Sequence, residues 1–276
     1  MSVEHVKQQA TEIWSNIQYE VDGGIGTRAH IGMVVICNDQ TLSHEARAML
    51  TIPGIALYES RIGRGSSPEQ RKKPLSIGLL EETFDGLDEA IQQINTMRRS
   101  DVVALGCTSA AMVIGPQELE RRVRNVHPEA RVTDPFAAIL SALRALGSAR
   151  VGFVSPYPRQ IAEKMIRGIE TAGVKVPIAA TFHNATGLVR NEAPFISPVS
   201  ISNAVRQVSD SADLDTVVIA CTQMRAAAII NELEHQTGKL IISSNQAICW
   251  HALRLAECRD VIGGWGRLFE RDLQQS

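Results

Sequence analysis

Short runs of apolar residues recur along most of this 276-residue chain, and polar or turn-forming residues bound each of them. A continuous apolar run of this length is typical of a strand that is buried on both faces of a parallel sheet. The expected strands lie at Ile31–Cys37, Gly54–Ser60, Asp101–Cys107, Arg131–Asp134, Arg150–Ser155, Lys175–Phe182, Asp215–Cys221 and Leu240–Ser243.

Amphipathic segments with helical spacing separate these strands. They are expected to begin near Ser43, to cover Glu81–Arg98, Pro116–Val126, Ser200–Ser209 and Ala226–His235, and to include Leu140, Leu143, Leu146, Trp250 and Leu253. Tyr157–Arg159 is the expected turn into a further helix. Two polar segments, 61–73 and 183–198, are expected to be loops. Regular alternation of strand and helix predicts parallel, doubly wound sheets with right-handed crossovers.

The most informative pattern is an internal repeat. Two segments each end an apolar run with a Cys-Thr pair, in which the Cys lies six residues after an Asp (101 to 107 and 215 to 221). The segments are Asp101-Val-Val-Ala-Leu-Gly-Cys107-Thr-Ser and Asp215-Thr-Val-Val-Ile-Ala-Cys221-Thr-Gln. The segment Val132-Thr-Asp134 likewise has a counterpart in Ile242-Ser-Ser-Asn245. We therefore predict an α/β fold of two pseudo-symmetric, Rossmann-like lobes, each a four-stranded parallel sheet flanked by helices. The active site is expected in the cleft between the lobes, at the strand carboxyl ends.

The repeat also predicts the domain boundaries. Residues 1–29 read as an N-terminal extension, in which an amphipathic stretch runs into a glycine-rich connector before the first strand. The first lobe is expected to comprise residues 30–135 plus 245–276 and to carry Cys107. The second lobe is expected to comprise residues 136–244 and to carry Cys221. Two lobes of this size are large enough to bury a core each.

Composition narrows the choice of ligand. The formal net charge is −2 and 21% of the residues are charged, so no basic surface favours nucleic acid, and the expected ligand is small. The apolar stretches are strand-sized and the N-terminus is polar, so neither a membrane span nor a signal peptide is expected and a cytoplasmic location follows. The 5 cysteines form no Cys-x-x-Cys and no Cys/His cluster, which argues against disulfides and against a metal site.

Cys107 and Cys221 are the candidate catalytic residues. A cysteine kept only for packing has no reason to recur at the same offset from a repeated Asp and before a repeated Thr. A helix is expected after each thiol, and its N-terminal amides would lower the thiol pKa from about 8.5 into the reactive range. Two opposed thiols suit proton removal from one face of a carbon and delivery to the other, or nucleophilic addition by one thiolate with the second as acid. Neither mechanism needs a metal or a cofactor.

Five further residues are candidates for binding a carboxylate. Asn38 ends the first strand and carries both donor and acceptor groups, and Tyr157 ends a later strand with a hydroxyl. Thr108 and Thr222 follow the two thiols, where they could bind substrate or serve as ordinary helix caps. Asn191 lies in a loop that is long for this fold. The charged segment 61–73 reads as a solvated loop or as a basic lid over an anionic substrate.

At these residues the chain resembles the Asp/Glu/hydantoin racemase superfamily, and within it the branch that holds maleate cis-trans isomerases and arylmalonate decarboxylases. The resemblance covers roughly residues 30–270. It rests on the motifs Gly106-Cys-Thr-Ser109, Ser155-Pro-Tyr157, Cys221-Thr-Gln223, Ile242-Ser-Ser-Asn-Gln-Ala-Ile-Cys-Trp250 and Gly264-Trp-Gly-Arg-Leu-Phe269.

The resemblance implies a division of labour between the thiols. The first cysteine of that family is thought to add to the double bond of maleate, giving a succinyl-type thioether, and Cys107 matches it. Cys221 matches the second cysteine, a proton donor and acceptor. Asn38, Tyr157 and Asn191 match the residues that bind carboxylates, while Ser109 belongs to the first motif and is expected to contact substrate with Thr108 and Thr222. The decarboxylases of this branch keep only the second cysteine, so Cys107 argues against that activity.

The chain departs from the isomerase pattern after the first strand. The isomerases typically have Pro-Ser-Ser-Asn-Thr there, whereas this chain has Val35-Ile-Cys-Asn-Asp-Gln-Thr41. Either Asn38 or Asp39 could therefore occupy the binding position. An Asp there would repel a second carboxylate.

The expected function is a cofactor-independent isomerase resembling maleate cis-trans isomerase, which acts on a small carboxylate or dicarboxylate through two cysteines. The chain is expected to form a homo-oligomer and to have no nucleic-acid or membrane partner. A racemase or epimerase of an amino acid or hydantoin would use the same thiols as a two-base pair. A third possibility is a non-catalytic protein that binds a small acid between its lobes, which predicts stabilisation by ligand without turnover.

Overall fold

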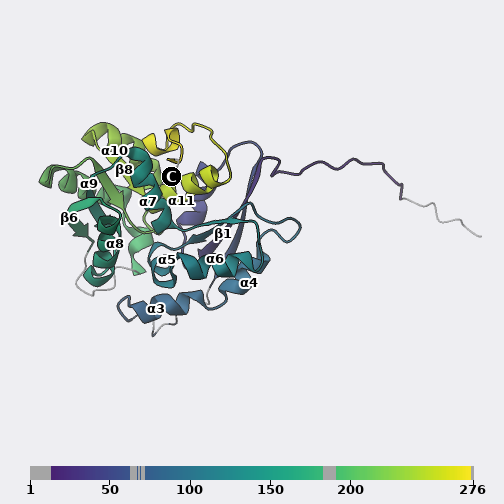
Figure 1. The fold of residues 1–276 in the computed structure, drawn as a ribbon, viewed down its shortest axis with the longest axis horizontal. Coiled ribbons are helices and arrows are strands. Elements are labelled where there is room, and N and C mark those ends of the chain that lie inside the picture. Colours follow the sequence, from purple (N-terminus) through teal and green to yellow (C-terminus); the bar gives the residue numbers. More distant parts are fainter. Residues whose placement is uncertain (1–13, 63–66, 68, 70–71, 183–190, 275–276) are drawn as a thin grey trace, which may run out of the picture.

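Two parallel sheets form the centre of the protein (Figure 1). The computed structural model describes residues 14–62, 67, 69, 72–182 and 191–274. The first sheet has the strand order β2-β1-β3-β4 and the second has the order β6-β5-β7-β8, and all neighbouring strands of these sheets pair in parallel. The prediction of two four-stranded parallel sheets flanked by helices is therefore confirmed.

The strands lie close to the expected apolar runs. Their bounds are β1 Ala29–Ile36, β2 Ile55–Ile62, β3 Val102–Gly106, β4 Arg131–Thr133, β5 Arg150–Ser155, β6 Lys175–Thr181, β7 Thr216–Ile219 and β8 Leu240–Ser243. The inner strands β3 and β7 are buried along their whole length. Continuous burial follows from helices on both faces of each sheet, which is why these strands read as unbroken apolar runs.

Helices connect the strands in the expected alternation. Their bounds are α1 Leu42–Met49, α3 Ile77–Glu81, α4 Leu87–Gln93, α5 Thr108–Ile114, α6 Pro116–Arg124, α7 Pro135–Leu146, α8 Arg159–Thr171, α9 Pro198–Ser211, α10 Ile230–Thr237 and α11 Ser244–Leu255. Short 3₁₀ turns lie at Glu82–Phe84, Ala193–Phe195, Ala227–Ile229 and Arg267–Glu270. Figure 1 shows α8, α9 and α10 on one side of the molecule and α3, α4 and α6 on the other.

Two central helices connect the sheets to each other. Helix α7 follows β4 of the first sheet yet packs against β8 of the second, while α11 follows β8 and packs against β3 and β4. The two helices also pack on each other, and Figure 1 shows them in the middle of the molecule. Each begins with a side-chain cap: the Asp134 carboxylate accepts from two backbone N–H groups of α7, and Ser243 and Gln246 form a capping box on α11. The predicted boundaries of the two lobes stay a prediction.

The prediction of one helix over Glu81–Arg98 is wrong. Helix α3 ends at Glu81, a 3₁₀ turn follows, and α4 covers Leu87–Gln93 only. The cause is Gly86, whose left-handed φ of 83° interrupts the helical path between the two segments.

The segment before β1 has neither helix nor strand over residues 14–28. Its large apolar side chains are exposed, among them Trp14, Ile17 and Tyr19, and Figure 1 shows it extending away from the body. The expected amphipathic stretch begins at Val3, outside the described residues. Among the helices of the described part, none is both long and apolar enough to cross a membrane.

Candidate active site

Cys107 lies where β3 ends and α5 begins. It is the N-cap residue of α5 in an extended conformation, and only 6% of it is exposed. Its Sγ lies 3.9 Å from the Ser109 hydroxyl, which is two residues further along the same turn. Gly106 allows this close turn, because a Cβ at that position would lie 2.2 Å from Leu42 Cδ2. The strand end therefore holds a buried thiol next to a hydroxyl.

Cys221 occupies the matching position after β7, and 8% of it is exposed. Its backbone has a φ of 152°, which L residues rarely adopt, and its N–H donates to the Ser244 hydroxyl at 3.0 Å. Ser244 also accepts a hydrogen bond of 2.9 Å from the Thr108 hydroxyl. One serine at the start of α11 thus joins the two Cys-Thr motifs.

Tyr157 interacts with both thiols. It follows β5 and is buried, and its hydroxyl makes polar contacts with the Cys221 thiol and the Ser109 side chain. Burial and the charges of both Cys221 and Cys107 raise the pKa of Tyr157 well above its usual value. Those electrostatic effects require all three groups to be close together. The structure thus brings together Cys107, Ser109, Tyr157 and Cys221.

Burial raises the pKa of both thiols above its ordinary value. Burial raises the pKa of Cys107 to about 11 and that of Cys221 to about 12. The Ala110 and Ser109 amides lower the Cys107 value, and the Tyr157 hydroxyl and the Gln223 amide lower the Cys221 value, but desolvation is larger. The prediction of lowered thiol pKa values is therefore wrong.

The expectation of a helix directly after each thiol holds only in part. Helix α5 follows Cys107 at once, whereas residues 222–226 form a turn and an irregular segment before the 3₁₀ turn at Ala227–Ile229. Cys221 therefore lacks the N-terminal amides of an adjacent helix. Its raised pKa reflects an environment in which the charged form has lost water without a matching set of donors.

The structure distinguishes the two candidates after β1. Asn38 is exposed, whereas Asp39 is buried and its charge raises the pKa of both Cys107 and Cys221. The Thr222 side chain approaches the Asp39 carboxyl and lowers its pKa, although burial raises that pKa overall. Asp39, and not Asn38, therefore belongs to the cluster around the thiols.

The buried carboxyl of Glu45 links α1, which follows β1 of the first sheet, to segments that follow β7 and β8 of the second sheet. Glu45 on α1 accepts hydrogen bonds from the Ala227 backbone N–H (3.0 Å) and from Asn245 Nδ2 (2.7 Å). The same Asn245 nitrogen donates to the Thr222 carbonyl at 2.8 Å. Burial raises the pKa of Glu45 to about 7. This network holds the turn that follows Cys221.

Sequence reasoning did not identify Glu45, Ser244 or Asn245 as part of the site. The motif Ser243-Ser244-Asn245 is recognisable in the sequence, but the sequence does not indicate which groups its side chains contact. Glu45 offered no signal beyond its place in an amphipathic helix, because its partners lie 182 and 200 residues away in the chain.

The remaining predicted residues, Thr108 and Asn191, have other surroundings. The Thr108 hydroxyl donates a hydrogen bond to the Ser244 hydroxyl. Asn191 is exposed and lies in the segment that leads into α9. Residues 183–190 of the expected loop 183–198, and part of the charged segment 61–73, lie outside the described residues. Arg61 is described, and its guanidinium donates to the backbone carbonyls of Ile36 (3.3 Å) and Asp39 (2.8 Å).

The other cysteines lie outside this cluster. Cys249 is fully buried in α11 and Cys258 is buried after it, while Cys37 is half-buried at the end of β1. All five are free thiols. Within the described ranges, no group of His, Cys, Asp and Glu side chains could hold a metal ion.

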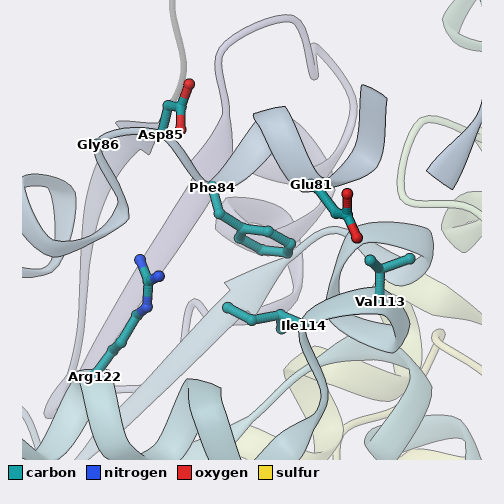
Figure 2. A pocket seen from close by; sticks show the side chains of 7 residues that line it. All are labelled: Glu81, Phe84, Asp85, Gly86, Val113, Ile114 and Arg122. Atoms are coloured by element: carbon teal, nitrogen blue, oxygen red, sulfur yellow. The ribbon is translucent and has the colours of Figure 1, made fainter. Parts of the chain in front are cut away.

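A cavity of about 470 Å³ lies away from the thiols (Figure 2). Val113 and Ile114 line it at the far end of α5 from Cys107, opposite Phe84, and the Glu81 and Arg122 side chains also border it. Arg122 is already paired with Glu118 at 2.8 Å and with Asp88 at 3.7 Å. None of the residues that surround the thiols contributes to this cavity.

Comparison with known proteins agrees with this arrangement. The family model for arylmalonate decarboxylase matches residues 74–269. A maleate isomerase of Nocardia farcinica is 28% identical over 180 residues, which are 62% of this chain and 70% of that protein. This relative supports the expectation of an enzyme of the isomerase type.

Two solved structures have the same fold. The maleate isomerase of Pseudomonas putida S16 is 23% identical with a TM-score of 0.74, and the match covers 88% of this chain and 98% of that one. A mutant of a Nocardia farcinica maleate cis-trans isomerase, with a covalently bound succinylcysteine intermediate, is 24% identical with a TM-score of 0.70 and the same coverage. The chain therefore belongs to the arylmalonate decarboxylase family, in the branch of the Asp/Glu/hydantoin racemase superfamily that also holds the maleate isomerases.

Proposed function

We propose that this protein is a cofactor-independent cis-trans isomerase that acts on a small unsaturated acid through Cys107 and Cys221. The observation that carries the proposal is the pair of buried thiols at the ends of β3 and β7, with the Tyr157 hydroxyl in contact with the Cys221 thiol and the Ser109 side chain. A decarboxylase that follows the one-thiol pattern has no use for Cys107. The succinylcysteine in a relative of the same fold supports covalent catalysis by one of the two thiols.

In the proposed mechanism Cys107 is the nucleophile. Its sulfur bonds to one carbon of the double bond, and the electron pair of the π bond moves to the neighbouring carbon, which takes a proton from Cys221. The proton that leaves the Cys107 thiol replaces the one that Cys221 gives. The carbon-carbon bond of the thioether is single and rotates. In the reverse step Cys221 takes the added proton from carbon while its own thiol proton returns to the Cys107 sulfur, the carbon-sulfur bond breaks, and the double bond re-forms in the trans geometry.

The neutral thiols need a path for that proton exchange. Ser109 lies next to Cys107, and Tyr157 contacts both Ser109 and Cys221, so the two hydroxyls form a chain between the sulfur atoms. Such a chain lets one thiol lose a proton while the other remains protonated, which a low-dielectric site otherwise opposes. Tyr157 and Ser109 are thus assigned to proton transfer as well as to substrate binding.

The test is proton NMR in deuterated water with the wild-type protein and the variants Cys107→Ser and Cys221→Ser. An isomerase converts a cis-enedioate such as maleate, or its monoamide, to the trans product, and both variants lose at least about 100-fold in kcat because each removes a group of the covalent sequence. The control is Cys258→Ser, which leaves the thiol cluster intact and keeps a donor toward the Ala256 carbonyl. Full turnover by both active-site variants would overturn the proposal.

Mass spectrometry separates this reaction from racemisation. If Cys107 adds to substrate, Cys221→Ser accumulates a protein whose mass is increased by that of the acid, located on the peptide that contains Cys107. A two-base racemase forms no adduct and instead exchanges the α-hydrogen of an amino acid with solvent deuterium.

A further inference from the structure

The two oxygens of the Asp39 carboxylate have different surroundings. Oδ1 accepts hydrogen bonds from the backbone N–H groups of Thr41 and Leu42, each at 2.8 Å, and so holds the start of α1. Oδ2 is buried and has no hydrogen-bond partner, although the residue is only 1% exposed. A buried acceptor without a donor destabilises the fold, which makes this oxygen a candidate for binding a donor group of a ligand.

The Asp39 carboxyl lies near the two thiols. Strands β1 and β3 are neighbours in the first sheet, with Val34 paired to Leu105, so Asp39 and Cys107 reach the same sheet edge. The charge of Asp39 acts on both thiols, and the Thr222 side chain, next to Cys221, approaches its carboxyl without completing a hydrogen bond to Oδ2. The Asp39 carboxyl is therefore close enough to interact with a ligand bound at the thiols.

The charge around Asp39 is not neutralised at the carboxyl. Arg61 is the cation whose charge lowers the Asp39 pKa, but its guanidinium donates to backbone carbonyls, including that of Asp39 itself, and not to the carboxyl. Glu45 is a second buried carboxyl that interacts electrostatically with Asp39. When Asp39 is ionised, a substrate carboxylate placed against Oδ2 meets like charge, which disfavours its binding in a site that excludes water.

We propose that the substrate is an acid with one carboxylate and, in place of a second carboxylate, a group that donates hydrogen bonds, and that this group binds Asp39 Oδ2. For an isomerase of the proposed type this class is the monoamide of a cis-enedioate. The amide nitrogen supplies the donor that Oδ2 lacks, and the hydroxyls of Ser109 and Tyr157 remain for the single carboxylate. The inference rests on the proposed function and names its substrate class.

The experiment compares maleamate with maleate as substrates of the wild-type protein and of Asp39→Asn. The substitution keeps the Oδ1 acceptor for Thr41 and Leu42 and places an NH₂ donor at the Oδ2 position, so the start of α1 is preserved. We expect the kcat/KM of the wild-type protein to be about 100-fold higher for maleamate than for maleate, and Asp39→Asn to reverse this preference. The reason is that a site built to pair with a donor group leaves its own acceptor unpaired when the substrate lacks that donor. Gln40→Ala, at the exposed neighbouring residue, is the control and keeps the wild-type ratio.

The outcomes separate this inference from the proposed function. The inference is overturned if the wild-type protein isomerises maleate at least as fast as maleamate, or if Asp39→Asn has the same ratio of kcat/KM for the two acids as the wild type. Either result leaves the proposed isomerase function intact. The proposed isomerase function is overturned if the protein exchanges the α-hydrogen of L-aspartate and isomerises neither acid. In that case the role of Asp39 in binding a donor group stands only if Asp39→Asn abolishes the exchange. If neither acid is converted and neither raises the Tm of the wild-type protein, both proposals fail.

Discussion

The Ser244 hydroxyl accepts the backbone N–H of Cys221 at 3.0 Å. The same oxygen accepts the Thr108 hydroxyl at 2.9 Å, so one side chain at the start of α11 fixes both Cys-Thr motifs relative to each other. The Cys221 backbone adopts a rarely populated conformation at this point, which the Ser244 contact helps to maintain. The distance between the two thiols is therefore set by a residue that takes no part in bond formation.

We predict that Ser244→Ala lowers kcat about tenfold with little change in KM, since misplacement of catalytic groups affects the reaction more than ground-state binding. The free energy of unfolding should fall by about 1–3 kcal/mol, because a buried N–H and a buried hydroxyl lose their acceptor. Steady-state kinetics and urea unfolding measure the two effects. Ser243→Ala is the matched control: it removes the cap of α11 at a cost of about 1 kcal/mol but contacts neither thiol, so its kcat should be that of the wild type.

The thiols should react slowly with alkylating reagents in the folded protein. Their pKa values are raised to about 11 for Cys107 and about 12 for Cys221, so the reactive thiolate is scarce at pH 7 and increases about tenfold for each unit of pH below those values. Iodoacetamide labelling between pH 7 and pH 9, followed by peptide mass spectrometry, measures the rate at each cysteine. The urea-unfolded chain is the reference. Equal labelling of Cys107 in the folded and unfolded protein at pH 7 would contradict the raised pKa.

Glu45 should make stability depend on pH in a specific window. Its pKa in the folded protein is about 7, above the value of about 4.3 for an unfolded chain, so between these values the folded state binds a proton that the unfolded state has released. The stabilisation is complete below about pH 4.3 and is lost as pH rises through about 7. The contribution of this group is about 4 kcal/mol at most.

Urea unfolding at pH 5 and pH 7 tests this. The free energy of unfolding of Glu45→Gln, which does not titrate, should fall less from pH 5 to pH 7 than that of the wild-type protein. Burial of Asp39 and Asp134 also raises their pKa values, so the informative quantity is the difference between the two proteins. Glu120→Gln on the exposed face of α6 is the control and should keep the wild-type pH dependence. Parallel curves for the wild type and Glu45→Gln would refute the assignment.

Gly106→Ala should destabilise the fold next to the thiols. The added Cβ would lie 2.2 Å from Leu42 Cδ2 and 3.1 Å from the Val34 carbonyl oxygen, and overpacking of this kind costs about 1–3 kcal/mol. Combining it with Leu42→Ala should cost less than the sum of the two single changes, because the smaller side chain removes the clash. Gly78→Ala in α3 meets no atom within 4 Å and should be neutral or slightly stabilising. Thermal unfolding of the four variants checks these signs.

Much of the fold was predictable because its signals are local. The apolar runs that end at Cys107 and Cys221 mark strands buried on both faces, and parallel strands present their carboxyl ends at one edge. The internal repeat then places two thiols at two such edges. The break at Gly86 also had a local signal, since Asp85-Gly86 is a turn pair inside an otherwise helical segment.

What only the tertiary structure decided concerns solvent and distant neighbours. The amides near Cys107 suggested a lowered pKa, but whether a thiol is desolvated depends on every element packed over it, and burial reverses the sign. The choice between Asn38 and Asp39 depends on where the chain turns after β1, which the pattern of apolar residues does not specify. Ser244 and Glu45 reach partners across the two sheets. A local sequence pattern determines which residues end a strand, whereas their protonation and their partners follow from contacts between segments that lie far apart in the chain.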